Sequence, residues 1–179
     1  MPKEELTTMI VDGGARGHAL AKAHERSPDV RRIVVAPGND GIAALAEKET
    51  ITAACDLSDP NSIRDVADRF HPDFIEVAQD DALAAGAVNV LREAGYETFG
   101  PTKYQSRIEW DKQWSREFME KHRIPIPPWR AFTSQAEGKK YVASRFIENP
   151  GETLFVKAAG LCAGKGALKS KSLEQALEN

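Results

Sequence analysis

Short apolar runs alternate with longer amphipathic stretches over the first hundred residues. Four runs rich in β-branched or aromatic residues predict strands, at residues 8–11, 33–36, 74–77 and 96–99. Three stretches between and after them predict helices, at residues 19–26, 60–70 and 83–94. The helix at 60–70 has the clearest start, because Asp59 can cap it and Pro60 suits its first position. Strand–helix alternation at this spacing predicts an α/β fold, with a parallel, Rossmann-like sheet covered by helices.

The pattern changes after residue 101. Thr102 and Gln105 have the spacing of a capping box, and a charged helix is expected from there to about residue 122. Trp110, Trp114 and Phe118 recur every fourth residue and therefore share one face. Packing of that face on a core is favoured over a ligand-binding role. The segment 124–128, IPIPP, predicts a rigid connector and the best domain boundary.

Beyond the connector the expected elements are few. They are a short strand at 129–132, a helix at 134–146, strands at 153–157 and 167–169, and a capping box at 172–175 that starts a last helix. A segment of this size buries its own core poorly. It is therefore expected either to pack on the first domain or to belong to a larger unit.

Charge and composition exclude several classes of partner. There are 24 Lys and Arg against 27 Asp and Glu, a net charge of −3, so neither nucleic acid nor an anionic membrane is an expected partner. No apolar run approaches the roughly 20 residues that span a bilayer, and the polar start has no signal-peptide core, which predicts a cytoplasmic location. The two cysteines form no zinc pattern; Cys55 is expected in the core, and Cys162 as a small filler in a loop.

The first candidate for chemistry is the glycine-rich segment 12–20 after the first predicted strand. Glycines and a following helix N-terminus suit an anion, and Arg16 and His18 can both bind one. Asp12 stands where a dinucleotide fingerprint needs its first glycine, and the second strand ends without the acidic residue that binds an NAD ribose. Phosphate binding and a purely structural tight turn remain alternatives.

The second candidate is the segment 157–166, where Lys157 and Lys165 accompany three glycines after a predicted strand. Such a loop can fold over a polyphosphate and balance its charge. It is not a P-loop, because Gly166 rather than Ser or Thr follows the Gly-Lys pair. The alternative is a mobile hairpin turn with solvated lysines.

Six segments together carry a family resemblance: GGARGHAL at 13–20, APGNDG at 36–41, FGPT at 99–102, DK at 111–112, IP at 124–125 and VKAAGLCAGKG at 156–166. In this order and spacing the chain resembles the N-terminal part of the phosphoribosylamine–glycine ligase (glycinamide ribonucleotide synthetase) family, ATP-grasp enzymes of purine biosynthesis. The resemblance implies a pre-ATP-grasp domain at 1–101, a linking helical segment at 102–124 and a partial ATP-grasp subdomain at 125–179.

The resemblance also implies a reaction and its sites. Glycine, ATP and 5-phosphoribosylamine give glycinamide ribonucleotide, ADP and phosphate through glycyl phosphate, with Mg²⁺ or Mn²⁺ as the metal. The residues matched to the phosphoribosylamine side are Gly14, Arg16, Gly17, His18, Gly38, Asn39 and Asp80. Those matched to the ATP side are Lys112, Lys157, Gly160, Gly164, Lys165 and Gly166. No catalytic residue and no metal ligand is assigned in this chain.

The sequence departs from the family pattern at several points. Asp80 stands where the family usually has glutamate, Gly17 replaces a usual glutamate, and Ala159 replaces a usual aspartate of the nucleotide loop. Family members are more than twice as long, and their later part carries the metal ligands and the glycine site. The chain alone is therefore expected to be inactive, with a separate C-terminal half as a candidate partner. The alternatives are a non-catalytic phosphoribosyl- or nucleotide-binding module and, less favoured, a dinucleotide-binding reductase domain.

Overall fold

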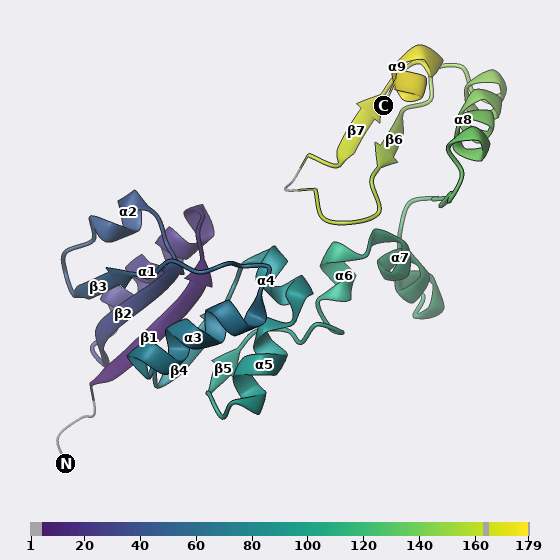
Figure 1. The fold of residues 1–179 in the computed structure, drawn as a ribbon. Coiled ribbons are helices and arrows are strands. Elements are labelled where there is room, and N and C mark those ends of the chain that lie inside the picture. Colours follow the sequence, from purple (N-terminus) through teal and green to yellow (C-terminus); the bar gives the residue numbers. More distant parts are fainter. Residues whose placement is uncertain (1–4, 163–164, 179) are drawn as a thin grey trace. The chain divides into compact units, whose positions relative to one another are not determined.

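A five-stranded parallel sheet is the centre of the first of two units in the computed structural model, which describes residues 5–162 and 165–178. The units are Met1–Ser106 and Arg107–Asn179. The sheet order is β3-β2-β1-β4-β5 (Figure 1). The strands are β1 Leu6–Asp12, β2 Val30–Pro37, β3 Glu49–Thr52, β4 Phe74–Val77 and β5 Thr98–Phe99.

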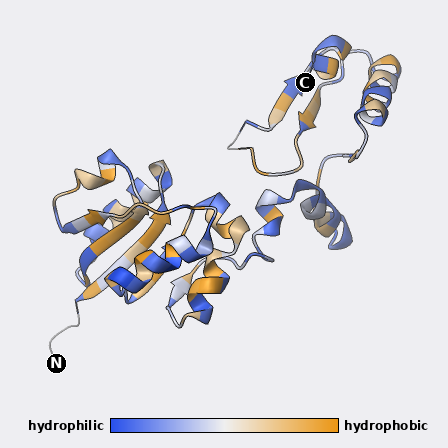
Figure 2. Ribbon diagram, in the orientation of Figure 1, coloured by the Kyte–Doolittle hydropathy of each residue, from blue (hydrophilic) through white to orange (hydrophobic). Residues whose placement is uncertain are grey.

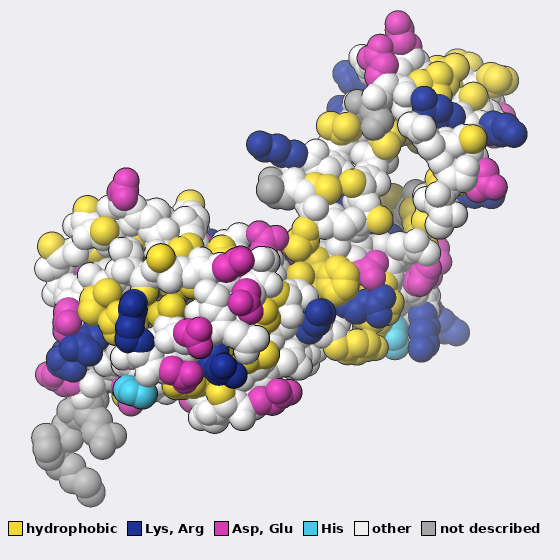
Figure 3. Space-filling view, in the orientation of Figure 1, with side chains coloured by type: hydrophobic (Ala, Val, Ile, Leu, Met, Phe, Trp, Pro, Cys, Tyr) yellow, Lys and Arg dark blue, Asp and Glu magenta, His cyan; other side chains and the backbone are white. Residues whose placement is uncertain are grey.

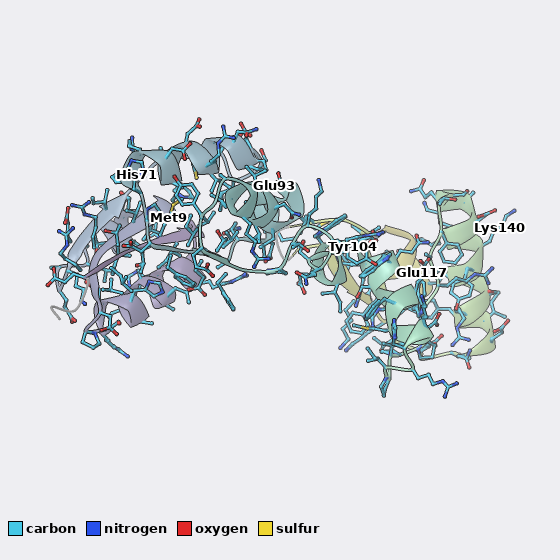
Figure 4. All side chains as sticks on the ribbon, turned by 90° about the horizontal axis from the view of Figure 1, so that it is seen from below. Met9, His71, Glu93, Tyr104, Glu117 and Lys140 are labelled. Atoms are coloured by element: carbon cyan, nitrogen blue, oxygen red, sulfur yellow. The ribbon has the colours of Figure 1, made fainter. Side chains whose placement is uncertain are left out.

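Helices cover both faces of this sheet, as the sequence predicts. The helices of the first unit are α1 Ala15–Glu25, α2 Asp40–Ala43, α3 Pro60–Phe70, α4 Asp80–Ala85 and α5 Ala87–Glu93. On one face, Ile10 and Ile33 pack against Ala21 of α1 and Ile42 of α2. On the other face, α3, α4 and α5 cover a larger core that includes Met9, labelled in Figure 4. The central strands β1 and β2 accordingly stand out as apolar in Figure 2.

The predicted elements of this unit are mostly confirmed, with shifted ends. The helix α3 begins and ends where expected: the Asp59 carboxylate accepts the Asn61 N–H at 2.9 Å, and His71 ends the helix in a left-handed conformation. The helix predicted at 83–94 is wrong as one element, because Gly86, with φ of 102°, separates α4 from α5. The first helix starts at Ala15, four residues earlier than predicted.

Within the described part of the second unit there are four helices and a hairpin. They are α6 Arg107–Trp110, α7 Lys112–Lys121, α8 Gln135–Glu148, β6 Leu154–Lys157, β7 Ala167–Ser170 and α9 Leu173–Glu178. The strands β6 and β7 pair antiparallel. Exposed polar side chains of α7 and α8 include Glu117 and Lys140, labelled in Figure 4, while Ile147 is an exposed apolar side chain of α8. None of the helices among the described residues is long and apolar enough to cross a membrane.

Two sequence predictions for this unit need correction. The charged helix expected to run to residue 122 is interrupted at Asp111, whose carboxylate accepts the Trp114 N–H at 3.0 Å and starts α7. The strand expected at 129–132 is absent from the described residues. Its aromatic side chains pack instead, because Trp129 donates to Glu120 at 2.8 Å and Phe132 lies against Tyr141. Of the three aromatic residues expected on one helix face, Trp114 and Phe118 lie on α7 and stack at 5.2 Å between ring centroids, whereas Trp110 belongs to α6.

Candidate functional site: two glycine-rich loops

The first loop lies where three parallel strands end together. The strand β1 is the central strand of the sheet, with β2 on one side and β4 on the other. The chain leaves β1 and β2 towards α1 and α2 on one face, and the helices after β4 pack on the other face. Ligands of open α/β sheets bind at such a switch point, outside the carboxyl ends of the strands. The loops after β1, β2 and β4 therefore define the candidate site of this unit.

Asp12, at the end of β1, shapes the first loop from inside. Its side chain is buried, and Oδ1 accepts the N–H of Gly14 at 2.5 Å. A Cβ on Gly17 would lie 2.8 Å from both Cβ and Oδ1 of Asp12, so only glycine fits beside this carboxylate. Sequence reasoning used Asp12 only to argue against a dinucleotide site. Its capping role could have been found from the Asp-x-Gly spacing, because aspartate often accepts the backbone N–H two residues on.

Asn39 ties the loop after β2 to the loop after β1. Its Nδ2 donates to the carbonyl oxygens of Gly13 at 3.2 Å and Gly14 at 3.4 Å, and its Oδ1 accepts the Ile42 N–H at 3.0 Å. Gly38 precedes it with φ of 72°, a conformation that favours glycine. Both amide hydrogens of Asn39 are therefore used within the protein, and its role here is to hold two loops together.

Arg16 links the same loop to the loop after β4. Its Nη1 donates to the Ala78 carbonyl oxygen and, at 3.1 Å, to Oδ1 of Asp80. The side chains are 57% and 38% exposed, so the ion pair by itself adds little stability. Its Nε and Nη2 hydrogens remain available for another acceptor, because among the described residues both contacts of the guanidinium are made by Nη1.

His18 completes this group. A Cβ on Gly41 would lie 3.2 Å from His18 Nδ1 and 3.2 Å from Asn39 Oδ1, which places these three residues side by side. The structure thus gathers all seven residues matched to the phosphoribosylamine side at one edge of the sheet. They are Gly14, Arg16, Gly17, His18, Gly38, Asn39 and Asp80.

The second loop, after β6, is fastened to the start of α7. The Lys112 backbone N–H donates to the Ala159 carbonyl at 3.1 Å, and Lys112 Nζ donates to the Gly160 carbonyl at 2.7 Å. The loop closes on itself, because the Ala158 N–H donates to the Gly166 carbonyl at 2.9 Å. Lys112, predicted on the ATP side, therefore lies directly against the predicted nucleotide loop.

The other residues matched to ATP lie on or near this hairpin. Lys157 ends β6 and is exposed, as is Lys165. A Cβ on Gly166 would lie 2.6 Å from the Cβ of Cys162, so this glycine is required by close packing. Gly164 lies outside the described residues. In the view of Figure 3, basic and acidic side chains are interspersed over the surface, in keeping with the small net charge of the chain.

Asp111 supports Lys112 from the preceding position. Its Oδ2 accepts from Arg107 at 2.8 Å, and this hydrogen bond, with a smaller contribution from the Trp114 N–H, lowers the pKa of the Asp111 carboxyl below its ordinary value. The Arg107 guanidinium also lies 4.7 Å from the Trp114 ring centroid. The start of α7 is thus held by three side chains, and with it the backbone of Lys112.

A metal site in these loops would need a set of ligating side chains close together. Within residues 5–162 and 165–178 there is no group of three or more His, Cys, Asp or Glu side chains that could hold a metal ion. The backbone N–H groups, lysines and arginine at the described loops are groups that can bind an anion.

Comparisons with known families match both units in succession. The family model "Phosphoribosylglycinamide synthetase, N domain" matches residues 6–109, and "Phosphoribosylglycinamide synthetase, ATP-grasp (A) domain" matches residues 110–179. The chain is 36% identical over 173 residues to the phosphoribosylamine–glycine ligase of Streptococcus pneumoniae serotype 4, covering 97% of this chain and 39% of that protein. It is 38% identical over 168 residues to the human trifunctional purine biosynthetic protein adenosine-3, covering 94% of this chain and 16% of that protein.

Solved structures share the fold at low identity. An N5-carboxyaminoimidazole synthase from Aspergillus clavatus, in complex with ADP and 5-aminoimidazole ribonucleotide, matches with a TM-score of 0.64 at 16% identity, over 98% of this chain and 43% of that one. The biotin carboxylase domain of a Hydrogenobacter thermophilus 2-oxoglutarate carboxylase, in complex with MgADP, matches with a TM-score of 0.67 at 16% identity, over 98% and 40%. The chain spans about two fifths of the length of the bacterial ligase and of these two structures.

Proposed function

The chain belongs to the phosphoribosylglycinamide synthetase family, and from this premise we propose that it forms the N-terminal part of an ATP-dependent ligase that joins glycine to 5-phosphoribosylamine. The glycine carboxylate attacks the γ-phosphorus of ATP, releasing ADP and forming glycyl phosphate. The amine of 5-phosphoribosylamine then attacks the acyl carbon, and phosphate leaves. The proposed product is glycinamide ribonucleotide, made in the cytoplasm.

The loop after β1 is proposed to bind the phosphoribosyl substrate. Arg16 offers its Nε and Nη2 hydrogens, a pair that can bind a phosphate bidentately. The start of α1 lies beside it, where backbone N–H groups favour an anion. Asn39, whose amide hydrogens are already used, is proposed to shape this loop rather than to bind substrate.

The hairpin of the second unit is proposed to bind the triphosphate of ATP. Lys112, Lys157 and Lys165 supply the positive charge, and the glycines at 160, 164 and 166 let the loop backbone approach an anion closely. Mg²⁺ or Mn²⁺ is the proposed metal, as phosphoryl transfer generally needs a divalent cation. The described residues hold no fitting set of metal ligands, so no step is assigned to a metal here.

One observation carries the proposal: two models of one family match the chain in succession, and each matched region holds one of the two loops. The domain division proposed with it is 1–101, 102–124 and 125–179. The test is release of ADP from ATP with magnesium, glycine and 5-phosphoribosylamine generated in situ. The purified chain is assayed alone and mixed with the C-terminal part of the Streptococcus pneumoniae ligase.

We expect ADP only from the mixture, dependent on both glycine and 5-phosphoribosylamine. Lys157→Ala should lower this rate, while Lys171→Ala, which removes an exposed lysine outside the glycine-rich loop, should leave it unchanged. No ADP from the mixture, together with binding of ribose 5-phosphate by the chain, would favour a binding module without turnover.

A further inference from the structure

The Asp80 side chain is partly exposed to solvent and also contacts Arg16. Its hydrogen bond and ion pair are to Nη1 of Arg16, at 3.1 Å, and the Ala78 carbonyl oxygen accepts from the same nitrogen. Ala78 lies in the loop after β4, Asp80 begins α4, and Arg16 belongs to the first turn of α1. The two loops that flank the switch point are therefore joined through one edge of one guanidinium.

This arrangement decides which part of Arg16 can meet a ligand. Nη1 makes both of these contacts, and it has a hydrogen for each acceptor. The remaining Nε and Nη2 hydrogens point the other way in the planar guanidinium, in the fork that matches two oxygens of a phosphate. A lysine at this position could not do the same, because one ammonium would have to serve the loop and the ligand together.

We propose that Asp80 is a positioning residue, which holds Arg16 by Nη1 so that its Nε/Nη2 edge faces the phosphate of a phosphorylated sugar. This inference rests on the proposed function and refines it, because the family resemblance only matches Asp80 to the phosphoribosylamine side without giving it a role. An arginine that is already ordered loses less conformational freedom on binding than a free one. The negative charge of Asp80 acts in the opposite direction, by weakening the attraction of Arg16 for anions.

Asp81 provides a matched control for that opposing charge effect. It is the next residue in the first turn of α4, and the described residues give it no hydrogen bond or ion pair. Asp80→Ala and Asp81→Ala remove the same charge from the same helix turn. If charge alone mattered, both changes would strengthen anion binding. If Asp80 orders Arg16, only Asp80→Ala weakens it.

The first measurement concerns the free 179-residue chain and needs no ligand. Side-chain nitrogen NMR of Arg16, assigned from its absence in Arg16→Lys, reports whether rotation of the guanidinium nitrogens is restrained. We expect restraint in the wild type, in Asp81→Ala and in Asp80→Asn, which keeps the acceptor oxygen, and clearly faster rotation in Asp80→Ala, where only the Ala78 carbonyl still accepts from Nη1. The same mobility in Asp80→Ala as in the wild type would overturn the proposal, whatever the protein binds.

The second measurement is calorimetric binding of inorganic phosphate and of ribose 5-phosphate. Asp80→Ala should weaken both by the same factor, about two- to tenfold, and should have no effect in an Arg16→Ala background. A loss confined to ribose 5-phosphate, or one that persists without Arg16, would make Asp80 a direct ribose ligand and refute positioning. If the wild type binds neither anion, the proposed phosphoribosyl site fails, and the NMR result still decides whether Asp80 holds Arg16.

Discussion

Gly17→Ala tests the packing between the first loop and the first helix. A helix-interior glycine normally gains about 1 kcal/mol of stability when it becomes alanine. At Gly17 the new Cβ would lie 2.8 Å from the Cβ of Asp12, an atom that no side-chain rotation can move away. Overpacking of this kind costs about 1–3 kcal/mol, and the rigid neighbour favours the upper end. We therefore expect a net loss of about 2 kcal/mol.

The matched background is Asp12→Gly, which removes the obstructing atoms. Asp12→Gly alone should cost about 2 kcal/mol, because Gly14 loses its side-chain cap and a strand gains a glycine. On that background Gly17→Ala should stabilise the chain by about 1 kcal/mol. The two changes are thus coupled by about 3 kcal/mol, as residues in contact can be. Gly138→Ala in α8 is the open control, because the nearest atom to its Cβ would be a Phe132 ring carbon at 3.7 Å.

Urea unfolding separates these effects by unit. The tryptophans are Trp110, Trp114 and Trp129, all in the second unit, so tryptophan fluorescence follows that unit and should respond to Gly138→Ala. Far-UV circular dichroism also reports the first unit and should respond to Gly17→Ala. The reasoning is refuted if Gly17→Ala is as stable as the wild type, or if it loses as much stability on the Asp12→Gly background.

Three further outcomes follow from single contacts. Lys112→Ala should speed backbone hydrogen exchange at 158–162 by about two- to tenfold, because the loop loses the side chain that holds it to α7. An unchanged exchange rate would show that the Lys112 backbone N–H alone is enough to hold the loop. Burial raises the pKa of Cys55 to about 11, so at pH 8 only about one thiol in a thousand is ionised. Iodoacetamide should therefore label Cys162 well before Cys55, as peptide mass spectrometry would show. Folding lowers the pKa of Asp111, so the contribution of this carboxylate to stability is complete above the ordinary aspartate pKa and is lost as the pH falls below it. Asp111→Asn should therefore make the free energy of unfolding of the second unit in urea depend less on pH in the acid range.

The helices and strands that the sequence predicts well are those with local signals at their ends. The helix α3 is marked by Asp59 and Pro60, and β4 by an apolar run that is buried on one side. The edge strand β3 was missed because its sequence, ETIT, has a single large apolar residue. It is a strand because it pairs with β2, where Glu49 also meets Arg32 at 2.9 Å. Pairing of this kind depends on residues far apart in the sequence.

The candidate site could likewise be predicted from the sequence only in part. Arg16, Asn39 and Asp80 could be selected from motifs, but their partners could not, because β1, β2 and β4 have to end together before those side chains meet. The prediction of a strand at 129–132 is wrong for the opposite reason. Aromatic residues favour strands only where a neighbouring strand can accept them, and here Trp129 finds Glu120 on a helix.

In both candidate anion sites a backbone carbonyl oxygen accepts a hydrogen bond from the cationic side chain. In the first unit the Ala78 carbonyl holds Arg16, and in the second the Gly160 carbonyl holds Lys112. A carbonyl oxygen orients a cation through its dipole and leaves the full positive charge available to a phosphate, whereas a carboxylate cancels it. Asp80 is the one carboxylate among these holding groups, and it is exposed enough for water to screen its charge. Arg16 can therefore be ordered by Asp80 and still attract a doubly charged phosphate, and for this reason Asp80→Asn, which keeps the acceptor without the charge, should bind phosphate at least as well as the wild type.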